Sequence, residues 1–128
     1  MQTVNDLALV IGRMLLAAIF VQSGFGKIAG YAGAAAYMES AGVPGILLPL
    51  VILVEFGGGL AIVLGWQTRW AALALAGFSI LSALLFHLQP GDRMQMINFM
   101  KNLSIAGGFL ALMVAGAGRF SLDARGGR

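Results

Sequence analysis

The sequence predicts an all-α integral membrane protein, a four-helix bundle that forms a single domain over residues 1–128. Two observations lead to this prediction. Of the 128 residues, 59% are hydrophobic and only 10% are charged, whereas soluble domains carry about 25% charged residues. The apolar residues also gather into four stretches, each close to the roughly 20 residues that a helix needs to cross a bilayer.

The four expected spans cover residues 7–29, 45–64, 70–87 and 98–117. We interpret each as a helix, because backbone polar groups cannot stay unpaired in lipid. None of them alternates between polar and apolar residues, as barrel strands do. The segments between the spans, "GYAGAAAYMESAGVP", "GWQTR" and "LQPGDRMQMI", are expected to connect them, and the tail "GRFSLDARGGR" is polar.

Charge and cysteine content exclude several functions. The net charge of +3 comes from scattered Lys and Arg residues, so nucleic acid is not an expected partner. The chain has no cysteine, which excludes disulfides, thiol redox chemistry and cysteine-ligated metal clusters. The expected surroundings are a lipid bilayer, and no metal site is predicted.

The distribution of positive residues predicts that both termini lie in the cytoplasm. An even number of spans puts the two termini on one side, and Lys and Arg favour the cytoplasmic side in short loops and tails. Trp66 and Trp70 fit an interfacial aromatic belt on that side. The positive residues favour the side of the termini by four to three: Arg69, Arg119, Arg125 and Arg128 against Lys27, Arg93 and Lys101.

Small residues recur at the spacing of helix contacts. Gly107, Ala111 and Ala115 repeat every four residues on the last span, and such positions let helix backbones approach closely in lipid. We expect them to pack inside the bundle, with a dimer face as the alternative, so an oligomer stays open.

Glu55 is the most unusual residue of the sequence, because it lies in the middle of the apolar stretch "VILVEFGGGLAIVLGW". An ionisable residue inside a span usually faces the bundle interior and has a partner. The first-choice partner is Arg13, which enters the first span from the side of the termini, and Lys101 is the second choice. We therefore predict a buried ion pair between Arg13 and Glu55.

A second polar group gathers near the expected outer face. We predict that three spans contribute to an outer-facing ligand pocket lined by Lys27, His87, Asn98, Lys101 and Asn102. The alternative is that these residues cap helix ends and extend to the headgroups. Met94, Met96 and Met100 near His87 are soft enough for Cu(I), but methionine more often fills gaps in packing.

Five stretches resemble the DoxX family, closest to its small four-helix inner-membrane members of the YphA type. The stretches are "GRMLLAAIFVQSGFGKIAG", "AGVP", "VEFGGGLAIVLGWQTRWAAL", "INFMKNLSIAGGFLAL" and "FSLD". Together they cover nearly the whole chain. The residues that match the family pattern are Arg13, Ser23, Gly24, Lys27, Glu55, Gly65, Thr68, Arg69, Asn98, Lys101 and Asn102.

The resemblance implies a four-helix bundle in a bacterial inner membrane and an association with membrane oxidoreductases. Some relatives are subunits of quinol oxidases or of thiosulfate:quinone oxidoreductases. This chain has no cysteine to hold such redox centres, so the resemblance implies an accessory subunit that works with another membrane or redox protein. The residues themselves require no cofactor. The resemblance makes a quinone the candidate cofactor.

Three functions therefore compete. The first is an accessory subunit that binds a quinone or another small ligand in the outer-facing pocket. The second is a small transporter or proton-linked permease that uses Arg13 and Glu55 as a buried relay. The third is a structural membrane scaffold without a ligand. The sequence leaves open whether the chain is itself an enzyme.

Overall fold

The computed structural model describes residues 2–125 of the chain, so Arg128, which entered the count of charges, lies outside the described residues. The elements, in order, are α1 (Gln2–Ala29), α2 (Tyr31–Ser40), η1 (Gly45–Leu47), α3 (Leu48–Ile52), η2 (Leu53–Gly57), α4 (Gly58–Leu64), α5 (Thr68–Ser82), η3 (Ala83–His87), α6 (Arg93–Ala115) and α7 (Leu122–Arg125). The described residues form no strand, and η2 and η3 are π-helices, which have one residue more per hydrogen-bonded turn.

Within residues 2–125, four continuous helical stretches are long and apolar enough to cross a membrane. They are Gln2–Ala29, Gly45–Leu64, Thr68–His87 and Arg93–Ala115. This confirms the all-α membrane fold. The second stretch has the expected bounds, whereas the fourth begins five residues earlier than expected, because the carboxylate of Asp92 accepts a hydrogen bond from the Gln95 amide and caps the helix at Arg93.

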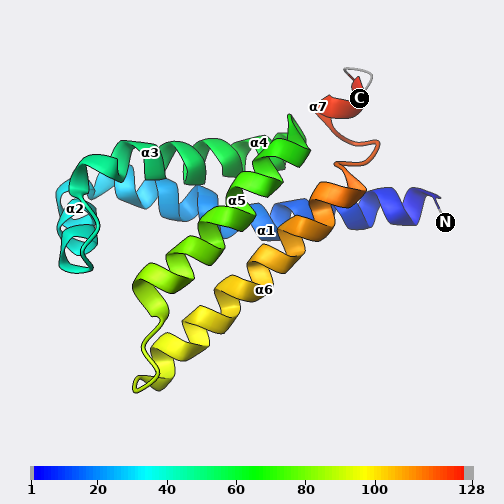
Figure 1. Cartoon of the computed structure of the whole chain (residues 1–128). Helices are drawn as coiled ribbons and strands as arrows, with labels where there is room; N and C mark the ends of the chain where they lie inside the picture. Colours follow the sequence, from blue (N-terminus) through cyan, green and yellow to red (C-terminus); the bar gives the residue numbers. More distant parts are fainter. Residues whose placement is uncertain (1, 126–128) are drawn as a thin grey trace.

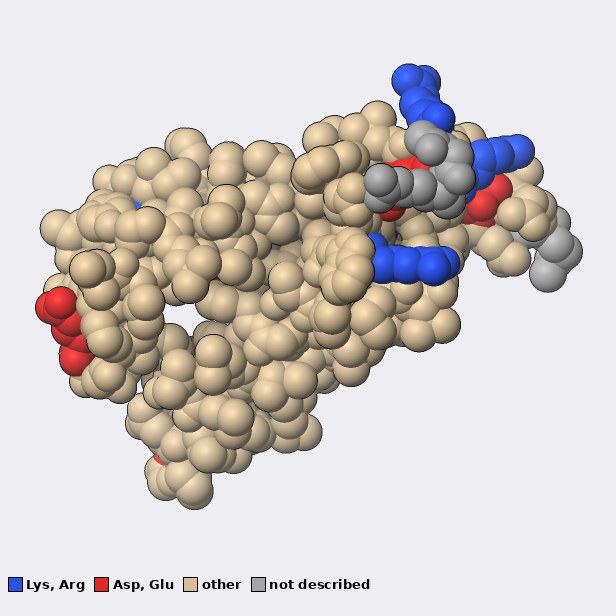
Figure 2. Space-filling model, turned by 45° about the horizontal axis from the view of Figure 1, so that its top comes forward, with Lys and Arg blue, Asp and Glu red and all other residues tan. Residues whose placement is uncertain are grey.

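The helices form two antiparallel pairs that meet at one end and diverge at the other (Figure 1). α1 lies beside the stretch from α3 to α4, and α5 lies beside α6. The pairs converge near the two termini, and α2 crosses the diverging end between α1 and η1. Charged residues gather mainly toward the ends, while the surface between them shows few charged side chains and is hollowed between the two pairs (Figure 2).

Glycines set the register between α1 and its antiparallel partner. A Cβ added to Gly24 would lie 2.7 Å from the Cβ of Phe56 and 2.8 Å from its backbone nitrogen. A Cβ on Gly59 would lie 2.9 Å from the side chain of Val21. Only residues without a side chain permit this approach, so the backbones of α1 and η2 are closest at the level of Gly24 and Phe56.

Aromatic side chains fill the core where the two pairs converge. Phe20 of α1 packs edge-on against Phe109 of α6 and Phe78 of α5, with ring centroids 5.6 and 6.3 Å apart. Ala17 and Leu75 are fully buried beside them. Because the pairs diverge beyond this layer, Phe20 and Phe78 also form the inner end of the space between them.

One short helix was not predicted, and one expectation about packing was wrong. The segment read as a connection before the second span contains α2, whose alanines favour a helix although its ten residues cannot span a bilayer. On α6, Gly107, Ala111 and Ala115 lie on the exposed face, and a Cβ on Gly107 would meet nothing within 4 Å. Packing inside the bundle falls instead to Ala106, Phe109 and Leu112.

Candidate ligand-binding site

A buried ion pair joins α1 to the π-helix η2. Nζ of Lys27 lies 2.7 Å from Oε1 of Glu55 and donates a hydrogen bond of 2.7 Å to Oγ of Ser23, one turn earlier on α1. The side chain of Glu55 is 6% exposed and that of Lys27 is 27% exposed. The carboxylate is therefore the deeply buried partner, and the ammonium group compensates its charge from the end of α1.

The predicted pairing of Glu55 with Arg13 was wrong, and so was the alternative with Lys101. Glu55 lies level with Gly24 in the register described above, and eleven residues of α1, about 16 Å of helix, separate Gly24 from Arg13. Arg13 instead donates hydrogen bonds to the carbonyl oxygens of Ala117 (3.3 Å) and Phe120 (2.9 Å). The buried relay on which the transporter hypothesis rests is therefore not formed.

Next to the ion pair, the diverging helix pairs enclose a cavity of about 590 Å³. Its walls are mainly apolar and come from α1, α2, the second span, α5 with η3, and α6. The polar side chains that line it include Lys27, Glu55, Ser79, His87 and Asn102. A largely apolar cavity of this size with a few convergent polar groups is typical of small-molecule sites.

The cavity brings together only part of the predicted pocket. Lys27, His87 and Asn102 line it, whereas Asn98 and Lys101 do not. Lys101 is exposed on another face, where it borders a shallow groove with Met96 and Met100. Lys101 lies beside Asn102 in sequence but on a different face of α6. Asn98 lies on the same face as Asn102, one turn earlier and beyond the residues that line the cavity.

On the α5–α6 side of the cavity, two polar side chains form hydrogen bonds and one hydroxyl group does not. Nδ1 of His87 lies 2.7 Å from Oε1 of Gln95, which fixes the imidazole at the end of η3. Nδ2 of Asn102 donates a long hydrogen bond of 3.4 Å to the carbonyl oxygen of Ser79. The hydroxyl of Ser79 itself is buried and has no hydrogen-bond partner among the described residues.

Sequence reasoning missed Ser79 and Tyr37 as cavity residues. Ser79 stands within an apolar span, in "GFSILSALLFH", where it and Ser82 are the hydroxyl-bearing residues, and their presence in such a span was the available signal. Tyr37 belongs to α2, and its ring stacks on that of Phe86 at the end of η3, with centroids 5.3 Å apart. Nothing in the sequence indicates that contact, because it depends on where α2 crosses the diverging pairs.

At the opposite end of the bundle, the C-terminal tail is clamped onto the first three spans. Asp123 accepts hydrogen bonds from the amides of Gln67 (2.8 Å) and Thr68 (2.9 Å), and so caps α5. Its own amide donates to the carbonyl oxygen of Gly65 (2.8 Å). Gly65 ends α4 with a φ of +69°, and a Cβ there would collide with Arg13. This cluster, which we call the tail clamp, has a structural role.

The fold defines a small integral membrane protein with four helices that can span the bilayer and a cavity between two diverging helix pairs. The chain belongs to the DoxX family: the family model named DoxX matches residues 8–88. It is 50% identical over 123 residues to the inner membrane protein YqjF of Escherichia coli K12, covering 96% of this chain and 95% of that protein. It is also 40% identical over 124 residues to the inner membrane protein YphA of the same organism, covering 91% and 89%.

No solved structure matches this chain. The relatives and the four candidate spans make it a multi-pass inner membrane protein. Most of the residues that carry the family resemblance lie at one or the other end of the bundle. Ser23, Gly24, Lys27, Glu55 and Asn102 build or line the cavity. Arg13, Gly65 and Thr68 belong to the tail clamp.

Proposed function

We propose that this DoxX protein binds a quinone or a similar small ligand in the cavity and serves as an accessory subunit of a membrane oxidoreductase system. The observation that supports this proposal best is the buried Lys27–Glu55 pair at the wall of an apolar cavity of about 590 Å³. A cavity of that size suits a single aromatic ring with substituents. The accessory role rests on the resemblance to relatives of quinone-linked enzymes.

The polar groups around the cavity match the chemistry of a quinone head. Its two carbonyl oxygens accept hydrogen bonds, and donors are available from opposite sides: the ammonium group of Lys27 on α1, and the amide of Asn102 and hydroxyl of Ser79 on the α5–α6 side. Burial strengthens such bonds, because no water competes for them. The carboxylate of Glu55 is placed to accept a hydrogen bond from a hydroxyl group when the ligand is in its quinol form.

The orientation of the protein is part of the proposal. With both termini in the cytoplasm, the tail clamp lies at the cytoplasmic end and the cavity lies in the outer half of the bilayer. The charge distribution of the loops and the tail supports this orientation. A C-terminal reporter that is active only outside the cytoplasm tests it, and activity of that reporter would reverse the placement of the cavity.

The test of binding uses purified protein in lipid nanodiscs and decylubiquinone as the probe, with affinity measured by calorimetry. We expect saturable binding to the natural chain and a loss of about 10- to 100-fold for Lys27→Met, the range for a lost charge-assisted hydrogen bond. Lys101→Met is the matched control, because Lys101 is exposed outside the cavity, and its affinity should stay within about twofold, as for other surface substitutions. Absence of saturable binding would favour the scaffold hypothesis instead.

A further inference from the structure

The cavity borders the lipid as well as the protein core. Ile19, Leu50, Leu81 and Leu85 all line it, yet 45–57% of each residue is exposed at the surface. A side chain that both lines a cavity and is half exposed marks an opening. These four residues come from α1, α3, α5 and η3. They belong to the two diverging helix pairs, here called the two arms, between which the surface is hollowed (Figure 2).

That opening lies within the apolar zone of the molecule. Leu50 belongs to the second span and Leu85 to the third, and both stretches are apolar enough to cross a membrane. The surface around the hollow carries no charged group in the view of Figure 2. In a membrane the opening therefore leads into hydrocarbon, where it admits chains of methylene or isoprene units and excludes polar solutes.

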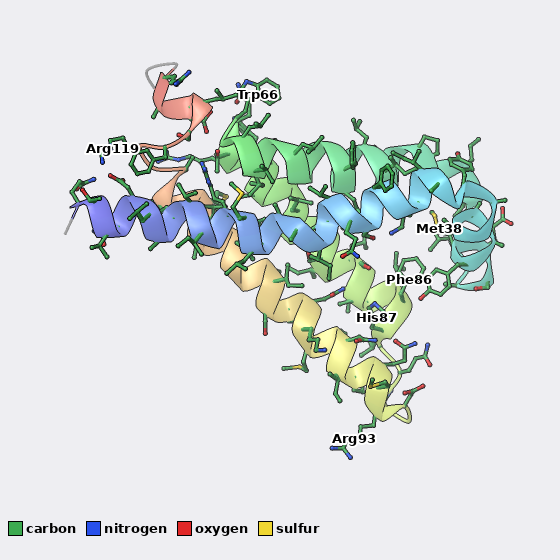
Figure 3. The ribbon with its side chains drawn as sticks, turned by 180° about the vertical axis from the view of Figure 1, so that it is seen from behind. Met38, Trp66, Phe86, His87, Arg93 and Arg119 are labelled. Atoms are coloured by element: carbon green, nitrogen blue, oxygen red, sulfur yellow. The ribbon has the colours of Figure 1, made fainter. Side chains whose placement is uncertain are left out.

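The end of the cavity toward α2 is closed by side chains from both arms. The ring of Tyr37 on α2 stacks on that of Phe86 on η3 at an interplanar angle of 17°, and both residues line the cavity. Met38, beside Tyr37, is 3% exposed and lines the cavity too. Figure 3 shows Met38 and Phe86 on the two elements that face each other across this end. The aromatic pair thus joins α2 to η3 across this end of the cavity.

We propose that the cavity takes a tailed, membrane-dissolved ligand through the side opening between the two arms, and that the Tyr37–Phe86 pair closes its aqueous end. This rests on the proposed function and specifies the class of ligand and its route. The head is held at Lys27 and Glu55, and the tail leaves past Leu50 and Leu85 into the bilayer. A soluble metabolite that arrives from the outer aqueous phase is not the ligand of such a site.

The first experiment fills the side opening. Leu85→Trp adds bulk at the opening, and Leu84→Trp is its matched control, since Leu84 is 51% exposed but does not line the cavity. Two probes are titrated into nanodiscs: decylubiquinone and its tail-less head, 2,3-dimethoxy-5-methyl-1,4-benzoquinone. For Leu85→Trp we expect the affinity for the tailed probe to fall by about tenfold, the factor that roughly two methylenes of tail contribute. The affinity for the head should change by less than about threefold.

The second experiment locks the aqueous end. The chain has no cysteine, so Tyr37→Cys with Phe86→Cys gives one defined pair of thiols, which a short bismaleimide joins. Binding of decylubiquinone should persist in the joined protein, because the probe enters from the bilayer. Abolished binding after joining, or equal affinity of Leu85→Trp and Leu84→Trp for the tailed probe, would overturn the proposed route. Failure of the natural chain to bind either probe would instead remove the proposed function together with the route.

Discussion

Replacing Lys27 by Met should destabilise the protein more than removing its partner Glu55. The two side chains differ in depth: 6% of the Glu55 side chain is exposed, against 27% for Lys27. Lys27→Met leaves a carboxylate in the apolar interior, where it must take up a proton or remain uncompensated. Glu55→Gln leaves an ammonium group that still donates to Ser23 and reaches toward the surface.

The magnitude follows from the burial of each group. Loss of one partner of a fully buried ion pair costs about 3–5 kcal/mol. Lys27 is partly exposed and Glu55 can be protonated, so we expect about 2 kcal/mol for Lys27→Met, and under about 1 kcal/mol for Glu55→Gln. For a chain of this length, 2 kcal/mol corresponds to a fall in Tm of roughly 6–10 °C. The double variant should recover part of this loss, because no unpaired charge remains.

The assay is a double-variant cycle on thermal unfolding in detergent, read by size-exclusion chromatography after heating. A coupling free energy of about 1 kcal/mol or more between Lys27 and Glu55 is expected, since residues in contact couple by about 0.5–3 kcal/mol. Arg13→Met should combine additively with Glu55→Gln, because Arg13 contacts the tail instead. Coupling of Glu55 to Arg13 and none to Lys27 would refute this assignment of partners.

Three further predictions concern backbone contacts and the tail clamp. Asp123→Ala removes the cap of α5 and should lower the free energy of unfolding by about 1 kcal/mol, measured as a lower Tm. Gly24→Ala should lower the yield of folded protein on size-exclusion chromatography, because the added methyl meets the backbone of η2. Gly26→Ala is the control and should leave the yield unchanged, because a Cβ at Gly26 would meet no atom within 4 Å. Gly65→Ala should lower the free energy of unfolding by more than about 1 kcal/mol, because it puts a side chain on a left-handed backbone and the added methyl collides with Arg13 in the tail clamp. A Tm equal to that of the natural chain would contradict this account.

Composition and span length were enough to predict the membrane fold, because the cost of burying polar backbone in lipid leaves only a helix for such apolar stretches. The same reasoning could not find α2, since hydropathy detects spans and not short helices at their ends. It also could not find the tail clamp. The contacts of Asp123 with the amides before α5 join residues that are 55 and 56 positions apart, and nothing local indicates them.

For the site, sequence reasoning found most of the polar residues but paired them wrongly. Depth counted from the span ends placed Arg13 near Glu55, because it ignored how the two helices are shifted against each other. Gly24 sets that shift because it lets Phe56 approach the backbone of α1. Glu55, next to Phe56, then reaches Lys27, which lies about one turn beyond Gly24 on α1. The glycine was part of the family pattern, but its role as the point of closest approach becomes clear only when both helices are placed.

The two π-helices carry two of the cavity's polar side chains. η2 contains Glu55 and η3 ends at His87, and both segments line the cavity from opposite arms. A π-helical turn adds a residue and so rotates the residues that follow relative to a regular helix. It costs stability, and π-helical turns occur frequently at functional sites. Among the described residues, both π-helices border this one cavity. A protein whose role was only to pack four helices in lipid would have no need for these distortions at the same place, so their position favours a ligand over a scaffold.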